Sequence, residues 1–411
     1  MKTSTNPSGC LAAAIFGLLL VARLTATADN QYWNPTTTAK AAGSNDWSTS
    51  VGAWAPTSAG TTTPAPWVNG NDAWFNLNTG VNHATVNGVS AGLLYFQDGT
   101  FTFWPGTGPL TLTGPMTNVN NTLTFNTDIV LAADQNWYVS SKQTTVNGAI
   151  TGPYTLKKTG AGSSALVFAN TNSAFGGLFV ESGNVNANSG GGVIGGATST
   201  LTMGSPEQDL VAKLSLNPRT DQSETSWDVG PVVANGYGEI SFVSDGTKLN
   251  IVPFGALSRD SNGVLALRQS AGNFEVRQNV SFANGAQVAV NGMLPPWVVT
   301  PASGDFLAYD GLVKTLVYKT TAPNTWTETD VVHNSSTRTL EADAAVYALR
   351  ASADLTVPSG LTLTNAGGGL ILVGKTLHGN GTLTSGTNEL VVYATSSSAI
   401  NTAIAANGLI V

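Results

Sequence analysis

The chain has 411 residues, and only 10% of them are charged, against roughly 25% in an average soluble protein. The formal net charge is −7, and the longest run of basic residues is Lys157–Lys158. Phosphate contacts need clustered Lys and Arg side chains, so these values argue against a nucleic-acid-binding surface. A hydrophobic content of 42% argues equally against simple disorder, because such a chain can bury a large core.

The beginning of the chain has the order of a secretory signal peptide. Lys2 gives a positive start, the apolar run Leu11–Leu20 is too short to span a bilayer, and Ala26–Ala28 is a small-x-small cleavage site. An uncleaved anchor would have to extend past Arg23, which interrupts the apolar stretch. Residues 1–28 are therefore predicted to be a signal peptide that is removed on export. No second apolar run long enough for a membrane-spanning helix follows.

Short apolar runs with a period of two fill the rest of the chain, and Gly, Pro, Asn and Asp separate them. Their β-branched and aromatic side chains suit a pleated surface. The pattern predicts strands at Leu93–Phe96, Phe101–Phe103, Leu110–Leu112, Leu123–Phe125, Ala165–Phe168, Leu178–Val180, Ile240–Val243, Leu265–Leu267, Val288–Val290, Leu361–Leu363, Leu370–Val373 and Leu390–Tyr393. Only Ser396–Ala406 suggests a helix, because Ile400 and Ile404 lie four positions apart. The chain is therefore predicted to be all-β.

Two all-β architectures compete. A sandwich or closed barrel would use strands of about five or more residues joined by hairpins, whereas a parallel β-solenoid uses short strands on each face of a coil. The runs here are short, and Gly, Asn and Thr occupy the turns, which favours the solenoid. Stacked coils pair their backbones with one another and need few charges along their length. This expectation accounts for the low charged fraction.

One stretch, residues 154–183, carries a denser pattern than the rest. It contains Leu156-Lys157-Lys158-Thr159-Gly160-Ala161-Gly162, Leu166-Val167-Phe168, Phe175-Gly176-Gly177 and Val180-Glu181-Ser182-Gly183. This pattern resembles the autotransporter-associated β-strand repeat, also called the passenger-associated transport repeat. Its glycines suit turns that need a positive φ or a close approach of two backbones. The resemblance implies a right-handed parallel β-helix that a bacterium exports and displays or releases outside the cell.

The flanks are similar to segments of the same large bacterial surface proteins. These segments are Asn71–Phe75, Gly255–Arg259, Asn291–Trp297 and Gly304–Asp310. Residues 29–105 are accordingly expected to form a Trp-rich N-terminal cap with the first strands, and residues 106–411 a β-solenoid. A loop insertion is expected at 205–228, where charged residues interrupt the strand pattern.

Groups suited to catalysis are few. Residues 29–411 contain no cysteine, because Cys10 lies in the signal segment, so no thiol nucleophile, disulfide or cysteine-based zinc site is expected there. His83, His333 and His378 have no second histidine nearby, and the sequence gives no sign of a zinc site or a triad. Gly190–Gly195 matches a dinucleotide-binding spacing, but a strand-like segment follows where a helix is required. We expect a loop there.

The best candidate for catalysis is a mixed-charge segment that holds Arg219, Asp221, Glu224 and Asp228. Polysaccharide hydrolases use paired carboxylates, and polysaccharide lyases use acidic calcium ligands beside Arg or Lys. Weaker candidates of the same kind are the pairs Asp305 with Asp310 and Glu341 with Asp343. The competing interpretation of the segment is a solvated loop that bulges from the solenoid.

Tryptophans are concentrated near the start of the mature chain, at Trp33, Trp47, Trp54, Trp67 and Trp74. If exposed and coplanar, they would form a platform for sugar rings. If buried, they would close the end of the solenoid, which otherwise presents unpaired strand edges. We favour the cap.

The sequence as a whole predicts an exported structural or adhesion solenoid, extracellular or on the outer cell surface of a bacterium, without catalytic, metal or cofactor sites. Surface polysaccharide or other cell-surface components are its expected partners. One alternative is a polysaccharide-active β-helix enzyme that uses the Arg219–Asp228 segment. A further alternative is a carbohydrate-binding module that uses exposed tryptophans.

Overall fold

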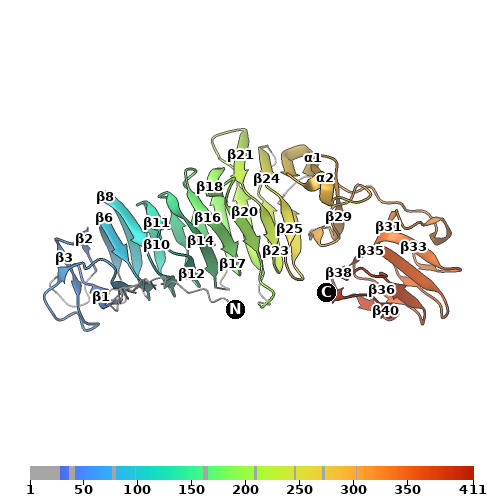
Figure 1. The fold of residues 1–411 in the computed structure, drawn as a ribbon, viewed down its shortest axis with the longest axis horizontal. Helices are drawn as coiled ribbons and strands as arrows, with labels where there is room; N and C mark the ends of the chain where they lie inside the picture. Colours follow the sequence, from blue (N-terminus) through green and yellow to red (C-terminus); the bar gives the residue numbers. More distant parts are fainter. Residues whose placement is uncertain are drawn as a thin grey trace, which may run out of the picture.

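The computed structural model describes residues 28–411, apart from 37–41, 76–79, 98, 161–164, 208–210, 245–246, 271–273 and 302. Nearly all of the predicted signal peptide, Cys10 and Gly162 lie outside the described residues. The chain is almost entirely β-structure, with 56% strand and 3% helix. Its parallel strands form a first stack, residues 28–315, and a second stack, residues 316–411, which follow each other along the long axis of the molecule (Figure 1).

Three ladders of parallel strands build the first stack, each ladder being a row of strands bonded one to the next. The first ladder contains β2 (Ser44–Trp47), β6 (Val81–Ala91), β8 (Thr100–Leu112), β10 (Thr122–Phe125), β13 (Thr144–Val146), β15 (Ala165–Phe168), β17 (Gly183–Asn188), β20 (Ala212–Asn217), β23 (Tyr237–Phe242), β26 (Val264–Gln269) and β28 (Val298–Thr300).

The second ladder begins with the C-terminal halves of β6 and β8. It continues through β11 (Ile129–Leu131), β14 (Ile150–Thr159) and the start of β16 (Ala174–Val180). A separate sheet follows, made of β18 (Gly191–Gly196), β21 (Glu224–Val229), β24 (Leu249–Phe254) and β27 (Gln278–Phe282).

The third ladder includes the C-terminal halves of β14 and β16. Its other strands are β1 (Asn30–Trp33), β5 (Asp72–Phe75), β7 (Leu94–Phe96), β9 (Met116–Asn118), β12 (Gln135–Val139), β19 (Thr200–Met203), β22 (Val232–Ala234) and β25 (Leu257–Arg259).

The length of chain from one layer to the next is short in the first half of this stack. Phe101 pairs with Leu123, and Leu123 pairs with Thr144, so these two layers are almost equal in length. Later layers are longer, as the pairing of Val185 with Leu214 shows. These longer layers carry β21 and β24, which project from the body of the stack in Figure 1.

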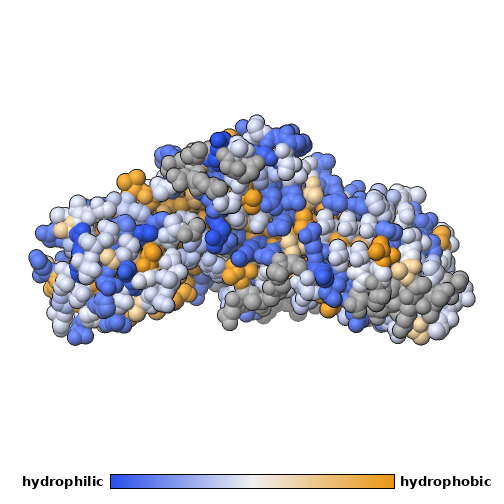
Figure 2. Space-filling model, turned by 180° about the vertical axis from the view of Figure 1, so that it is seen from behind, coloured by the Kyte–Doolittle hydropathy of each residue, from blue (hydrophilic) through white to orange (hydrophobic). Residues whose placement is uncertain are grey.

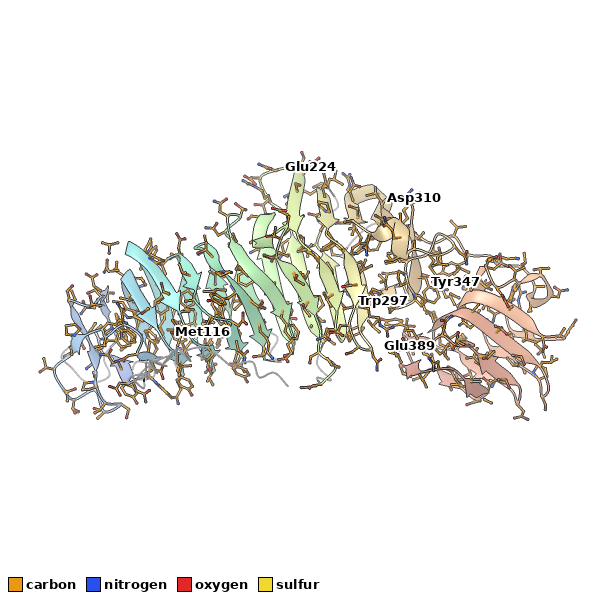
Figure 3. The ribbon with its side chains drawn as sticks, in the orientation of Figure 1. Met116, Glu224, Trp297, Asp310, Tyr347 and Glu389 are labelled. Carbon is orange, nitrogen blue, oxygen red and sulfur yellow. The ribbon has the colours of Figure 1, made fainter. Side chains whose placement is uncertain are left out.

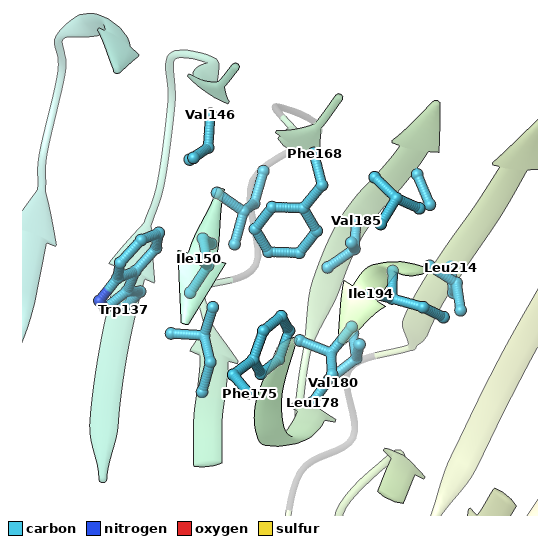
Figure 4. Packing of buried hydrophobic residues seen from close by; sticks show 14 of the residues in the cluster. Trp137, Val146, Ile150, Phe168, Phe175, Leu178, Val180, Val185, Ile194 and Leu214 are labelled. Carbon is cyan, nitrogen blue, oxygen red and sulfur yellow. The ribbon is translucent and has the colours of Figure 1, made fainter. Parts of the chain in front are cut away.

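Side chains alternate between the interior and the outer surface, as the period of two requires. Inward residues of successive layers pack on one another, and the rings of Phe103 and Phe125 stack with their centroids 4.6 Å apart. Figure 4 shows the same interior between Trp137 and Leu214. Burying each such Phe or Leu side chain contributes about 1.5–3 kcal/mol, so the continuous apolar column is the main source of stability.

Glycines in the predicted repeat have the backbone roles expected of them. Gly160 and Gly183 adopt φ values of +101° and +75°. A Cβ at Gly176 would lie 2.3 Å from the carbonyl oxygen of Pro153, in an adjacent layer. The repeat therefore needs glycine at these three positions.

Both ends of the first stack are covered. At the N-terminal end, β3 (Gly52–Ala55) pairs antiparallel with β1, and β4 (Ala65–Pro66) with β3. At the other end lie α1 (Phe274–Arg277), α2 (Gly285–Val288), and β29 (Asp305–Tyr309) and β30 (Val313–Thr315), which extend antiparallel from β28.

Side chains bond the backbone groups at the C-terminal end of the first stack. The Asn284 amide accepts from the Leu257 N–H at 2.7 Å and donates to the Leu257 carbonyl at 2.9 Å. The Tyr309 hydroxyl donates to the Phe282 carbonyl at 2.9 Å and accepts from the Phe282 N–H at 3.3 Å. These bonds satisfy groups that another strand would otherwise be needed to pair.

The second stack repeats the parallel arrangement on a smaller scale. It contains η1 (Pro323–Thr325), β31 (Val331–Asn334), β32 (Arg338–Thr339), β33 (Ala344–Ala351), β34 (Leu355–Thr356), β35 (Thr362–Leu372), β36 (Thr376–His378), β37 (Thr382–Thr384), β38 (Leu390–Ala394), β39 (Ala399–Ile400), β40 (Ala403–Ala405) and β41 (Leu409–Ile410). Its apolar interior is aliphatic, apart from Trp326 at its beginning.

Every predicted strand except Val288–Val290 lies on an observed strand, which overlaps it fully or to within one position at an end. At Val288–Val290 the structure has the end of α2 instead of a strand. This segment covers the C-terminal end of the first stack, where β27 is the last strand of its sheet. The helix expected at Ser396–Ala406 is also wrong. Ile400 and Ile404 instead extend ladders of the second stack, in β39 and β40.

Two predicted loops contain strands. The range 205–228 holds β20 and most of β21, whose inward residues continue the apolar column of the stack. Most of Gly190–Gly195 lies in β18. The glycines at 190, 191 and 195 have positive φ values, so this strand is irregular. The strand was not predicted because its glycine-rich sequence has no period of two.

Candidate functional site

The mixed-charge segment lies at the surface of the first stack. Arg219 makes a two-pronged ion pair with Asp221, at 3.1 and 3.0 Å, and both side chains are exposed. Glu224 and Asp228 point outward from β21, and Glu224 lies at the outer tip of the projecting region in Figure 3. Their arrangement is that of a solvated surface, not of convergent catalytic carboxylates.

The weaker acidic candidates bond other groups or are exposed. Asp310 bonds Lys314 at 2.5 Å, while Asp305 bonds Arg350 at 2.6 Å. The Asp343 carboxylate accepts from the Thr362 N–H at 2.8 Å, and Glu341 is exposed. His83, His333 and His378 lie in β6, β31 and β36 and do not meet. Within the described ranges, no cluster of three His, Cys, Asp or Glu side chains could hold a metal ion.

Four of the five N-terminal tryptophans are buried at the end of the first stack. Trp33, Trp47, Trp54 and Trp67 are at most 2% exposed. Their rings pack together, with centroids 4.5 Å apart for Trp54 and Trp67. These four side chains therefore form a core under β3 and β4 and cannot offer a flat platform to sugar rings.

The junction between the stacks brings apolar and ionisable side chains of both stacks together. Met293, Val299 and Phe306 of the first stack form an apolar cluster with Val331, Ala348 and Ile371 of the second. Two ion pairs cross beside it, Arg350–Asp305 and Arg259–Glu389, each at 2.6 Å. Glu389 lies between the two stacks in Figure 3. The stacks are thus joined by both apolar packing and charge.

Arg350 organises one side of this junction. Its guanidinium donates to the carbonyls of Gly304 and Ser303 and approaches His333 Nε2 at 2.7 Å. Arginine can only donate, so Nε2 accepts and the imidazole is neutral. Burial and the nearby Arg350 charge lower the pKa of His333. Ser352 Oγ lies 2.6 Å from the same nitrogen, but Asp305 bonds Arg350 rather than the imidazole, so the group is not a catalytic triad.

Lys158, in the predicted repeat, occupies an inward position of the third ladder and is fully buried. Its ammonium donates to the carbonyls of Thr159, Gly160 and Ser182 at 2.7–3.2 Å and reaches that of Val139 at 3.5 Å. These carbonyls belong to three successive layers. Burial lowers the pKa of Lys158 to about 8. The side chain links the layers from inside and is not accessible to a substrate.

The outer surface of the third ladder carries a column of aromatic side chains. Tyr32, Trp74 and Tyr95 lie at paired positions of β1, β5 and β7, and Tyr138 follows two layers later, beyond Thr117. Ring centroids are 6.0 Å apart for Tyr32 and Trp74 and 4.4 Å apart for Trp74 and Tyr95. Sequence reasoning did not find this column. The available signal was an aromatic residue that recurs in the sequence at intervals of one or two layers. Each of these residues lies next to a buried position and therefore points outward.

A polar hollow of about 540 Å³ lies at the N-terminal end of this column. Asp29, Asn30, Tyr32, Thr57 and Asn71 are among the residues that line it. A second cleft, of about 560 Å³, lies between the stacks, where the tyrosines Tyr237 and Tyr393 hydrogen-bond each other.

Comparisons with known proteins were negative. No family model, no curated protein and no solved structure matches the chain. In the part of the chain that the structure describes, no helix has the length and apolar character needed to cross a membrane.

Proposed function

We propose that this chain is an exported structural or adhesion rod, extracellular or on the outer cell surface of a bacterium, which works without catalysing a reaction. Its fold would be a right-handed parallel β-helix. The likeness of residues 154–183 to the autotransporter-associated repeat and the signal-like N-terminus support export. The parallel pairing of strands at short intervals, which are nearly constant in the first half of the first stack, supports the β-helix.

The junction between the stacks is the observation that carries the mechanical part of this proposal. An apolar cluster and two ion pairs that cross it hold the second stack against the first. A flexible linker would allow the stacks to move independently, whereas packed side chains on both surfaces oppose such motion. The face seen in Figure 2 is mainly hydrophilic or neutral, with hydrophobic side chains in small separate groups, as suits a surface in water.

The proposal is tested in cells and in solution. Antibody labelling and protease treatment of intact bacteria should reach the protein from outside, while a cytoplasmic control protein stays protected. Small-angle scattering of the purified protein should give one elongated particle with a fixed angle between the stacks. Protection of the chain in intact cells would overturn export, and a broad distribution of particle lengths would overturn the rigid rod.

A further inference from the structure

The polar hollow has side chains that are held in place before any ligand arrives. The Gln31 side chain accepts from the Val68 N–H at 2.9 Å and from the Asn71 amide at 3.2 Å. The Asn71 oxygen in turn accepts from the Asp29 N–H at 3.3 Å. The Trp74 indole N–H donates to the Asn30 amide at 3.0 Å. Amide, carboxylate and hydroxyl groups thus line the hollow together with the ring of Tyr32, and hydrogen bonds hold its Gln31, Asn71 and Asn30 side chains.

This combination suits a sugar. Hydroxyl groups of a sugar bond amides and carboxylates, and the apolar face of its ring packs on an aromatic side chain. Asp29 is exposed at the hollow, and Asp72 is paired with Asn30 in the adjoining strand. The exposed carboxylate of Asp29 disfavours an acidic sugar, because like charges would meet.

The aromatic column gives the ligand a direction. Adjacent strands of a sheet lie about 4.7–4.9 Å apart, which is close to the length of one unit in an extended polysaccharide. A straight chain along the third ladder would therefore place one sugar on each layer. From Tyr32 to Tyr138 it would cross four strand spacings, or about 19 Å. Thr117 and Thr159 lie on either side of Tyr138 in the ladder, and the tyrosine is 40% exposed, so its ring remains accessible.

We propose that an extended, uncharged β-(1→4)-linked polysaccharide binds along the third ladder, with one end in the hollow by Asp29 and Tyr32 and the chain passing over Tyr138. This inference rests on the proposed extracellular role and names its ligand class. The site differs from the alternative platform of exposed tryptophans, because Trp33, Trp47, Trp54 and Trp67 are buried and tyrosines form most of the aromatic column.

The test is calorimetric titration of the purified protein with dimers and hexamers of β-(1→4)-linked glucose and N-acetylglucosamine. At least one of the two hexamers should bind, and more tightly than its dimer. The substitution Asp29→Ala should weaken hexamer and dimer alike by about tenfold, since it removes an acceptor of the hollow. The substitution Tyr138→Ala should weaken the hexamer several-fold and leave the dimer unchanged, because only a long chain reaches that ring.

Trp104→Ala is the control. Trp104 is 47% exposed at the bend of β8 between the first and second ladders, away from the third, and its removal should not change binding. All variants should keep the thermal unfolding midpoint of the wild type. Failure of both hexamers to bind at millimolar concentration overturns the proposal, as does an equal effect of Tyr138→Ala and Trp104→Ala. Equally tight binding of a polyuronate would overturn the preference for uncharged chains. These outcomes do not depend on where the protein is located, which surface labelling decides separately.

Discussion

The two stacks share a parallel strand arrangement but fill their interiors differently. The first stack contains stacked phenylalanines and a core of four tryptophans at its end. The second has no phenylalanine, since Phe306 is the last in the chain, and its buried cluster is aliphatic apart from Trp326. Parallel pairing is therefore compatible with either interior. The smaller second stack buries less surface, so we expect it to depend on the junction for part of its stability.

Removing a large ring from the tryptophan core should cause the largest loss of stability, and the loss should be confined to the first stack. Trp54→Ala deletes a fully buried side chain that contacts three other tryptophans, and we expect a loss of about 3–5 kcal/mol in unfolding free energy. Urea denaturation with hydrogen exchange by mass spectrometry would locate the loss. The exposed Trp104→Ala should change stability by less than about 0.5 kcal/mol. Comparable losses in the two variants would show that the tryptophan core adds little.

Breaking the junction should separate the two stacks. Arg350→Met removes bonds to Asp305 and to the carbonyls of Ser303 and Gly304, and leaves a half-buried carboxylate without its cation. We expect a loss of about 2–3 kcal/mol, seen as earlier unfolding of the second stack while the first keeps its midpoint. Hydrogen exchange along the chain measures each stack separately.

Arg338→Met provides the matched control, because its guanidinium bonds the carbonyls of Thr320 and Thr321 within the second stack. It should leave the two stacks unfolding as in the wild type. If Arg350→Met also leaves the unfolding midpoints of both stacks as in the wild type, the stability of the second stack does not depend on the junction.

Strand positions could be predicted because alternation of side chains is a local property of the sequence. Leu123–Phe125 shows it within three positions, and its inward leucine and phenylalanine are buried as expected. The junction could not be predicted, since Asp305 and Arg350 are far apart in sequence and each resembles any solvated charge. The same limit applies to Arg219 and Asp221, whose mixed charge suggested a site although both are exposed. Ile400 and Ile404 misled because a helix and two short strands can both place apolar side chains at this spacing.

Lys158 is a further difference between the two stacks, because it is fully buried in the first and no lysine of the second stack is buried. Lys158→Met should cost about 1–3 kcal/mol at pH 7, since its carbonyl partners in three layers, Val139 included, lose their donor. Lys157→Met, at the next position but on the outer surface beside Glu181, should cost less than about 1 kcal/mol.

The stability difference between the wild type and Lys158→Met should depend on pH. The pKa of Lys158 is about 8 in the folded protein and 10.5 in the unfolded chain, so between these values the unfolded chain binds more protons. Wild-type stability from this residue should therefore rise with pH above 8, and the difference between wild type and Lys158→Met should widen. Urea midpoints of both proteins at about pH 7 and about pH 10 measure it. A difference that narrows instead would mean that the carbonyls hold the charged ammonium more strongly than burial opposes it.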